Sequence, residues 1–354
     1  MPRITLAALT LSLLAVRSAP GPQAQVPLAQ AQATDEFLTN LHKADNRSEP
    51  DERIEYYSRA IRAWRTGNGA SLLAHCHFNR GETHLNLARL DLAETDLAKA
   101  LSLDPGNARA YLLRGRLHLR TARAKAAEKD LREYASMKPS DADGRILLGE
   151  SRERAGRLSD ALKDFQQASR LDAWNWRAFV SMARVLTTQR KYGPAGQMLD
   201  KAETLAGGRE AAVATQRGLL LKETLKFEEA VEKLGLGINL HEEKAAELQR
   251  SVGKALDLQE CRESLSLAYH GRGATHEKLL NPGAALSDYH EACRLGHAPS
   301  CILAERQALR PPPAEVHKPP HPKPGPAPAP KPTPPKKKRA PKPKSDPGER
   351  IYGS

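Results

Sequence analysis

The chain has 354 residues, a formal net charge of +13 and an aromatic content of only 5%. Ala, Leu, Arg, Lys and Glu are abundant and β-branched runs are scarce, so the composition disfavours an all-β core and favours helices. Its four cysteines are too few for a disulfide-dense scaffold.

The N-terminal residues have the pattern of an export signal. Met1, Pro2 and Arg3 form a short positive start, and thirteen residues without charge follow, from Ile4 to Val16. That run is too short to cross a bilayer as a helix but suits a signal-peptide core. We therefore predict a signal peptide and short linker over residues 1–31, with several candidate cleavage sites, and a periplasmic or secreted protein. The alternative is a buried N-terminal helix. No later apolar run reaches membrane-spanning length.

Three columns of residues recur along the middle of the chain. Small residues stand at Gly81, Gly115, Gly149, Ala183, Gly218 and Gly273, with successive separations of 34, 34, 34, 35 and 55 residues. An alanine follows twelve residues after each, and a large apolar residue four further on, at Leu97, Leu131, Phe165, Leu199, Leu234 and Tyr289. Such a period is typical of stacked helix pairs, each of which depends on its neighbours for burial.

This pattern resembles the tetratricopeptide repeat family, most clearly from Gly81 through Ala93 to Pro105. The resemblance implies an all-α fold, a right-handed α-solenoid of about six to seven helix-turn-helix repeats. We place a degenerate leading repeat at 34–67, five repeats within 74–244 and a terminal repeat at 266–303. The motif residues are packing residues, so they predict the fold and say nothing of a ligand.

The 55-residue step leaves about 21 residues beyond a normal repeat. Within 245–265, Ala246, Leu248, Val252, Leu256 and Leu258 recur at amphipathic helical spacing. We therefore predict an inserted helix over 245–265.

Arginine and aspartate recur sixteen residues apart within units. The pairs are Arg80 with Asp96, Arg114 with Asp130, and Arg272 with Asp288. We predict structural ion pairs that join the two helices of one unit and set their register.

Candidate chemistry is sparse. His75, Cys76, His77 and His84 suggest a metal site, but His75 and His77 point to different faces of a helix, so core packing is the preferred interpretation. The sequence has no H-E-x-x-H motif, no paired CxxC, no phosphate-binding glycine loop and no nucleophile elbow. We predict no catalytic residue, no metal and no cofactor.

The resemblance places the first helix of each unit on the concave face, where family members hold extended peptides or helices. The positions facing inward are Arg109, Arg116, Arg120, Glu150, Arg154, Arg177 and Arg184. Arginine forks suit carboxylates and phosphates, so this arginine-rich stripe is the predicted partner groove. The alternative is an ordinary solvated helical face.

Cys293 and Cys301, eight residues apart, resemble the ends of Sel-like repeats. That resemblance implies a disulfide that closes the last unit, with two free thiols as the alternative.

Residues 311–354 hold 16 prolines, 10 Lys or Arg and 3 Asp or Glu, which gives them +7 of the total charge. This composition predicts a disordered tail of polyproline II character. We expect it to contact anionic envelope polymers or lipid headgroups.

The function predicted overall is a non-enzymatic interaction scaffold of the cell envelope, which binds a protein or peptide in its groove. The alternative is an intracellular adaptor in which Pro335–Arg339 serves nuclear import or nucleic-acid binding. Nucleic acid is the less favoured partner, because no aromatic residues interleave that run.

Overall fold

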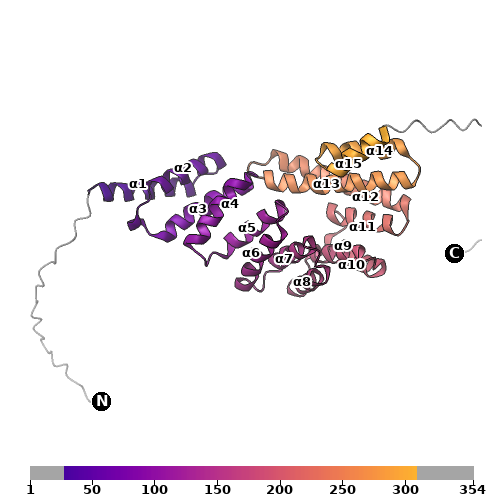
Figure 1. Ribbon diagram of the computed structural model, residues 1–354, viewed down its shortest axis with the longest axis horizontal. Helices are drawn as coiled ribbons and strands as arrows, with labels where there is room; N and C mark the ends of the chain where they lie inside the picture. Colours follow the sequence, from indigo (N-terminus) through magenta and orange to yellow (C-terminus); the bar gives the residue numbers. More distant parts are fainter. Residues whose placement is uncertain (1–27, 309–354) are drawn as a thin grey trace, which may run out of the picture. The chain divides into compact units, whose positions relative to one another are not determined.

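In the computed structural model the described residues, 28–308, form a succession of antiparallel helical hairpins (Figure 1). Side chains are described from residue 35 onward. The predicted all-α fold is confirmed. The predicted signal region up to residue 27 and the predicted tail lie outside the described residues.

The hairpins pair consecutive helices, and α15 (Ala298–Ala308) packs on the last of them. Their helices are α1 (Leu28–Asp45) with α2 (Pro50–Ala63), α3 (Ala70–Asn86) with α4 (Leu90–Leu103), α5 (Ala108–Arg120) with α6 (Ala124–Met137), α7 (Ala142–Arg154) with α8 (Leu158–Leu171), α9 (Trp176–Thr188) with α10 (Tyr192–Ala206), α11 (Ala211–Glu223) with α12 (Phe227–Arg250), and α13 (Ala255–Lys278) with α14 (Pro282–Arg294). A 3₁₀ turn, Thr66–Asn68, precedes α3.

Polar caps set where several of these helices begin. The side chains of Asn107, Asp141, Asn175 and Asn281 accept hydrogen bonds from backbone N–H groups in the first turns of α5, α7, α9 and α14. Such groups have no partner within the helix itself, so the cap replaces their bonds to water.

The two helices of a hairpin approach closely where the small and large columns meet. A Cβ added to Gly149 would lie 2.5 Å from Cε1 of Phe165, and one added to Gly115 would lie 2.7 Å from Cγ of Leu131. Phe165 and Leu131 are fully buried. The glycine column therefore makes room for the large side chain of the partner helix.

The prediction of an inserted helix over 245–265 is wrong. Its residues instead lengthen α12 and α13 to 24 residues each, with a turn between them at Ser251–Lys254. Of the apolar positions predicted there only Leu256 is buried, whereas Val252 is 71% exposed. Gly253, with φ +75°, adopts the left-handed conformation in the turn that separates the two helices. The extra residues form the tip of a long hairpin.

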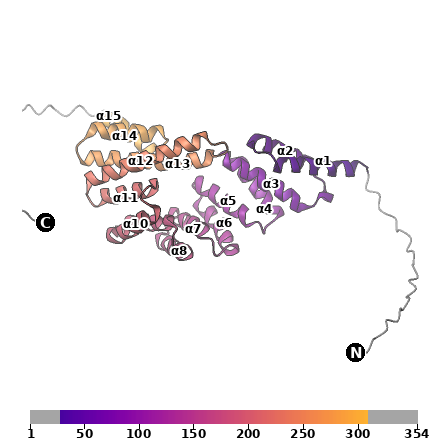
Figure 2. The same ribbon diagram turned by 180° about the vertical axis from the view of Figure 1, so that it is seen from behind.

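This long hairpin closes the inner helices into a ring. Each of α3, α5, α7, α9 and α11 contacts the next inner helix, α11 contacts α13, and α13 contacts α3. Figures 1 and 2 show α13 running back from the C-terminal hairpins toward α3 and α5. Leu256, near the start of α13, is buried in one cluster with Phe78, Leu113 and Leu117. The N-terminal part of α13 therefore packs on the concave side of the first repeats.

We expect Gly149→Ala to lower the free energy of unfolding by about 1–3 kcal/mol, because the added methyl group overlaps the ring of Phe165. Gly283→Ala in α14 is the matched control, since apart from its chain neighbours nothing lies within 4 Å of the added Cβ. The control should be neutral or stabilising by up to about 1 kcal/mol. Urea unfolding followed by circular dichroism measures both, and equal effects would refute the close-approach argument.

Candidate functional site

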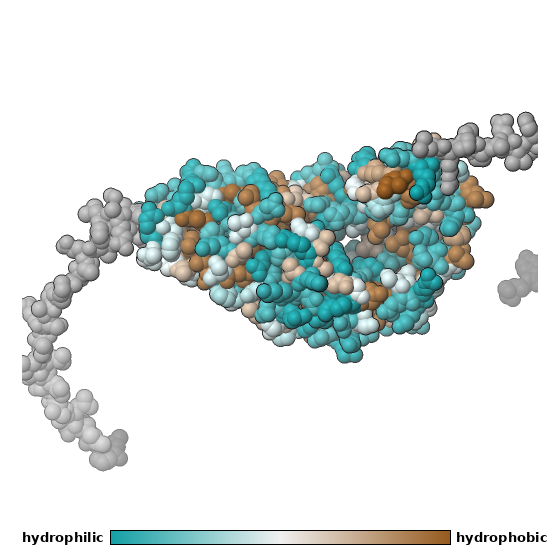
Figure 3. Space-filling model, in the orientation of Figure 1, coloured by the Kyte–Doolittle hydropathy of each residue, from teal (hydrophilic) through white to brown (hydrophobic). Residues whose placement is uncertain are grey.

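The ring encloses a cavity of about 690 Å³. Its walls come from the inner helices α5, α7 and α9, the start of α11, the second half of α12 and the first part of α13. The space-filling view shows the molecule hollowed between the long hairpin and the repeats facing it (Figure 3). A cavity of this size falls in the range of ligand-binding pockets.

The structure brings six of the seven predicted groove residues to this cavity, namely Arg116, Arg120, Glu150, Arg154, Arg177 and Arg184. Arg109 is not among the lining residues, and its guanidinium instead lies 2.6 Å from Glu82 of α3. The two helices that sequence reasoning did not assign to the groove, α12 and α13, supply the opposite wall.

The wall from α13 carries carboxylates that the sequence analysis did not foresee in the groove. Arg116 lies 3.5 Å from Glu260 and 3.9 Å from Asp257, and Arg120 forms an ion pair with Glu263. The side chain of Arg120 is only 8% exposed. The sequence analysis expected these arginines to be available for the carboxylates of a partner. In the structure, Arg116 and Arg120 are instead paired with carboxylates of α13.

Further round the ring, Arg184 lies 2.7 Å from Glu153 and 3.9 Å from Glu150. Arg154 donates a hydrogen bond to the backbone carbonyl of Leu119 at 2.5 Å. Arg177 is exposed and has no ion-pair partner within residues 35–308. Altogether six cationic side chains and seven carboxylates line the cavity, so its charges nearly cancel.

A thiol and an imidazole meet at the cavity wall, a pairing that the sequence analysis missed. Cys261 lies with its Sγ 3.3 Å from the carbonyl oxygen of His241 and 3.9 Å from its Nδ1. Burial raises the pKa of the Cys261 thiol, and burial together with Lys244 lowers the pKa of His241 to about 4. Both shifts favour the neutral forms, the opposite of an activated thiolate–imidazolium nucleophile.

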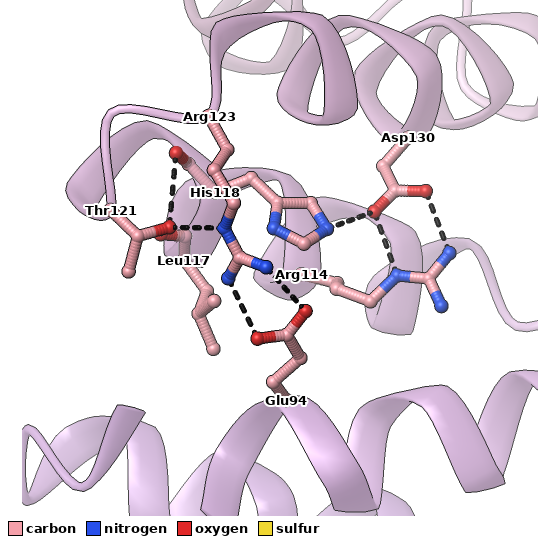
Figure 4. A network of polar contacts seen from close by, with 7 residues as sticks. All are labelled: Glu94, Arg114, Leu117, His118, Thr121, Arg123 and Asp130. Atoms are coloured by element: carbon pink, nitrogen blue, oxygen red, sulfur yellow. Dashed lines mark hydrogen bonds and ion pairs between the residues drawn. The ribbon is translucent and has the colours of Figure 1, made fainter. Parts of the chain in front are cut away.

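Each predicted Arg–Asp pair is present as a two-pronged ion pair between the helices of its unit. Arg80, Arg114 and Arg272 each lie 2.7 Å from the aspartate sixteen residues on. Asp96, Asp130 and Asp288 are almost fully buried. A histidine joins each pair in the structure, and Figure 4 shows His118 beside Asp130, at 3.4 Å.

The repeat formed by α7 and α8 has the aspartate at the same position, but its arginine comes from a different position on the first helix. Leu148 occupies the place of the arginine, and Arg152 lies 2.6 Å from Asp164, with Arg145 at 3.6 Å. Arg152 stands where the first two of these repeats have His84 and His118. The buried carboxylate is thus paired from the next turn of the same helix.

A second ion pair joins neighbouring repeats. The guanidinium of Arg123, at the start of α6, donates two hydrogen bonds of 2.7 Å to Glu94 of α4 (Figure 4). One repeat later, Arg157 forms an ion pair with Glu128. The sequence analysis missed these pairs, although both members recur at a spacing of 34.

Of the four His and Cys positions near residue 80, Cys76, His77 and His84 are buried, whereas His75 is exposed and lies 3.2 Å from Asp45, so the core-packing interpretation is wrong for His75. His77 lies 2.8 Å from Asp96, and His84 is buried. Between residues 35 and 308 no group of three or more His, Cys, Asp or Glu is placed to hold a metal ion. Cys293 and Cys301 are joined by a disulfide that links α14 to α15.

We expect Arg114→Ala and Asp130→Ala each to lower the free energy of unfolding by about 3–5 kcal/mol, since each leaves a buried charge without its partner. The double variant should be little worse than either, so the coupling should be nearly as large as one single effect, about 3 kcal/mol or more. The exposed pair Arg294 with Glu291 is the control, and its coupling should stay below about 0.5 kcal/mol. Additive effects at Arg114 and Asp130 in urea unfolding would contradict the pairing.

We also expect acid to destabilise the fold through His241. Its pKa is lowered in the folded state, so the unfolded chain binds the proton more readily, and the stabilisation present above about pH 6.5 is lost as the pH falls toward 4. His241→Leu should reduce the loss by up to about 1.4 kcal/mol per pH unit in urea titrations between pH 7 and 4.5. The exposed His290→Leu is the control, and identical pH slopes for His241→Leu and the unmodified chain would contradict the prediction.

None of the helices between Leu28 and Ala308 is both long and apolar enough to cross a membrane.

Comparison with known proteins agrees with the geometry. Residues 74–107 and 108–141 each match the family model described as tetratricopeptide repeat. A tetratricopeptide repeat protein from Parabacteroides merdae has a similar structure, with a TM-score of 0.63 at 16% identity over 78% of this chain and 99% of that one. MamA from Desulfovibrio magneticus matches at a TM-score of 0.45 and 20% identity, over 49% of this chain and 95% of its own. No curated protein matches the sequence.

Proteins of this repeat family typically serve as scaffolds for protein–protein interaction. In this chain, residues 74–141 match the model of that family twice, and the hairpins on either side share the fold of a solved tetratricopeptide repeat protein.

Proposed function

We propose that the protein is an exported, non-enzymatic scaffold that holds an extended or helical segment of a partner protein against the concave face of its helical ring. The observation that carries this proposal is the cavity itself, because six residues predicted for the groove from repeat positions alone line it together. A rigid, preformed concave surface binds with little ordering cost, which is how such scaffolds gain affinity.

The chemistry of the cavity supports binding rather than catalysis. In its one thiol–imidazole pair, burial favours the neutral thiol of Cys261 and the neutral imidazole of His241. The lining otherwise alternates arginines and carboxylates with apolar groups such as Leu112, Val180 and Trp176. A surface of this kind suits a peptide segment, whose backbone and side chains offer apolar contact and charges of both signs.

Two observations support export. The uncharged run Ile4–Val16 has the length of a signal-peptide core, and the disulfide between Cys293 and Cys301 is of a kind that persists in oxidising compartments. In that setting the Lys- and Pro-rich residues 311–354 would tether the scaffold to anionic envelope polymers or lipid headgroups. The competing proposal, an intracellular adaptor, rests on Pro335–Arg339 alone.

Affinity capture on the full chain tests the groove. The variant Arg154→Ala/Arg177→Ala/Lys244→Ala removes three cavity cations that lie outside the α5–α13 ion pairs. We expect it to capture at least tenfold less of the partner protein than the unmodified chain does. Lys99→Ala/Lys129→Ala/Arg170→Ala removes three exposed cations from α4, α6 and α8 and should capture normally. Equal yields from the two variants would refute binding in the cavity.

N-terminal sequencing of the protein purified from its native cells tests export. Cleavage within residues 16–33 is the expected result. An intact Met1 would instead favour the intracellular adaptor.

A further inference from the structure

The concave face already holds a helix, and that helix belongs to the chain itself. We infer that residues 251–264, the tip of the α12–α13 hairpin, are a built-in ligand of the face formed by α3 and α5, and that an acidic amphipathic helix of a partner protein binds there by displacing them. This inference rests on the proposed function, because it names the class of partner and the event that admits it.

The charges on the two facing helices are complementary. Asp257, Glu260 and Glu263 stand three residues apart and so lie along one side of α13. They meet Arg116 and Arg120, which stand four residues apart on one side of α5. Arg116 and Arg120, which bind the chain's own acidic helix, would bind any helix that presents carboxylates at the same spacing.

An apolar contact fixes the tip in place. Leu256 directly precedes the acidic residues, is 2% exposed and joins the cluster of Phe78, Leu113 and Leu117. A competing helix therefore needs one large apolar residue next to its acidic face. Apolar anchors beside charged residues are the usual pattern of helix-in-groove recognition.

The contact is weakest at Arg116. Arg116 reaches its two carboxylates only at 3.5 and 3.9 Å, and both partners of each of these pairs are partly exposed, which makes them weak. The pair of Arg120 with Glu263 is closer and Arg120 is 8% exposed, so a competing helix must supply a carboxylate there as well. Val252, at the turn, is 71% exposed. From Leu265 onward α13 is held independently by its packing against α12 and α14.

The position of the tip argues for displacement rather than addition. Carboxylates of α13 already occupy Arg116 and Arg120, and Leu256 already fills the apolar cluster beside them. A partner helix that uses the same arginines and the same apolar site therefore binds only where the tip has left.

A labelled peptide of residues 251–268, with Cys261→Ser, tests the exchange in trans on the full chain by fluorescence anisotropy. We expect the variant Asp257→Asn/Glu260→Gln/Glu263→Gln to bind this peptide at least tenfold more tightly than the unmodified chain does. Glu228→Gln/Glu243→Gln/Glu247→Gln neutralises three exposed acids on α12 and should match the unmodified chain. Adding Arg116→Ala/Arg120→Ala to the first variant should remove its gain.

Equal affinity of the two triple variants, or no binding to either, would overturn the inference. Circular dichroism checks that each variant folds. Amide hydrogen exchange on the unmodified chain gives a second measurement that needs no variant: excess peptide should speed exchange over residues 255–264, and a peptide with its three acids neutralised should not. Unchanged exchange with the acidic peptide would also overturn it.

These outcomes are distinct from those of the capture experiment. If capture depends on Arg154, Arg177 and Lys244 while the peptide never exchanges, the groove function stands and the displaceable tip is wrong. If the peptide exchanges but no captured protein depends on the cavity, the tip is displaceable and the proposed function is wrong.

Discussion

The structure depends on how closely the two helices of each hairpin approach. At Gly149, Gly115 and Gly218 there is no space for a Cβ, because the large residue of the partner helix fills it within 2.5–2.7 Å of where that atom would be. This contact recurs at almost every unit, so each hairpin has nearly the same shape, and identical units stacked at a fixed rotation must curve. The curvature brings the concave sides of distant repeats face to face and makes the cavity.

Buried charge reinforces that geometry without supplying most of the stability. Four units have a buried aspartate at the same repeat position. In each, an arginine of the facing helix pairs with it, either from the position before the small residue (Arg80, Arg114, Arg272) or from one turn later (Arg152). Two buried charges gain little over apolar residues of the same size, but either one left alone is costly. Such pairs therefore penalise wrong registers of the two helices more than they add to the correct one.

Contacts that repeat at the period of the sequence could be predicted, and contacts between distant repeats could not. The small and large columns and the Arg–Asp pairs recur at a fixed separation, so the helical hairpins and their bridges followed from spacing. The pair of Glu94 with Arg123 carried the same signal and could have been found. Arg120 and Glu263 are 143 residues apart and occur once, so nothing in the repeat pattern links them. The wrong prediction at 245–265 has the same origin. Periodicity predicted helix there, but it gave no sign that the chain reverses at the turn around Gly253, between α12 and α13.

The long hairpin changes what the net charge of the protein implies. Sequence alone places an arginine-rich stripe on the concave face, which suggests a surface that attracts any anion. The tip of the hairpin sets three carboxylates against the two arginines of α5, and the lining as a whole holds six cations and seven acids. Nonspecific attraction is therefore cancelled, whereas a helix with acids at the matching spacing and an apolar anchor can still compete for those arginines. The closed ring thus selects by pattern rather than by net charge, and residues 311–354 alone carry +7 of the overall +13.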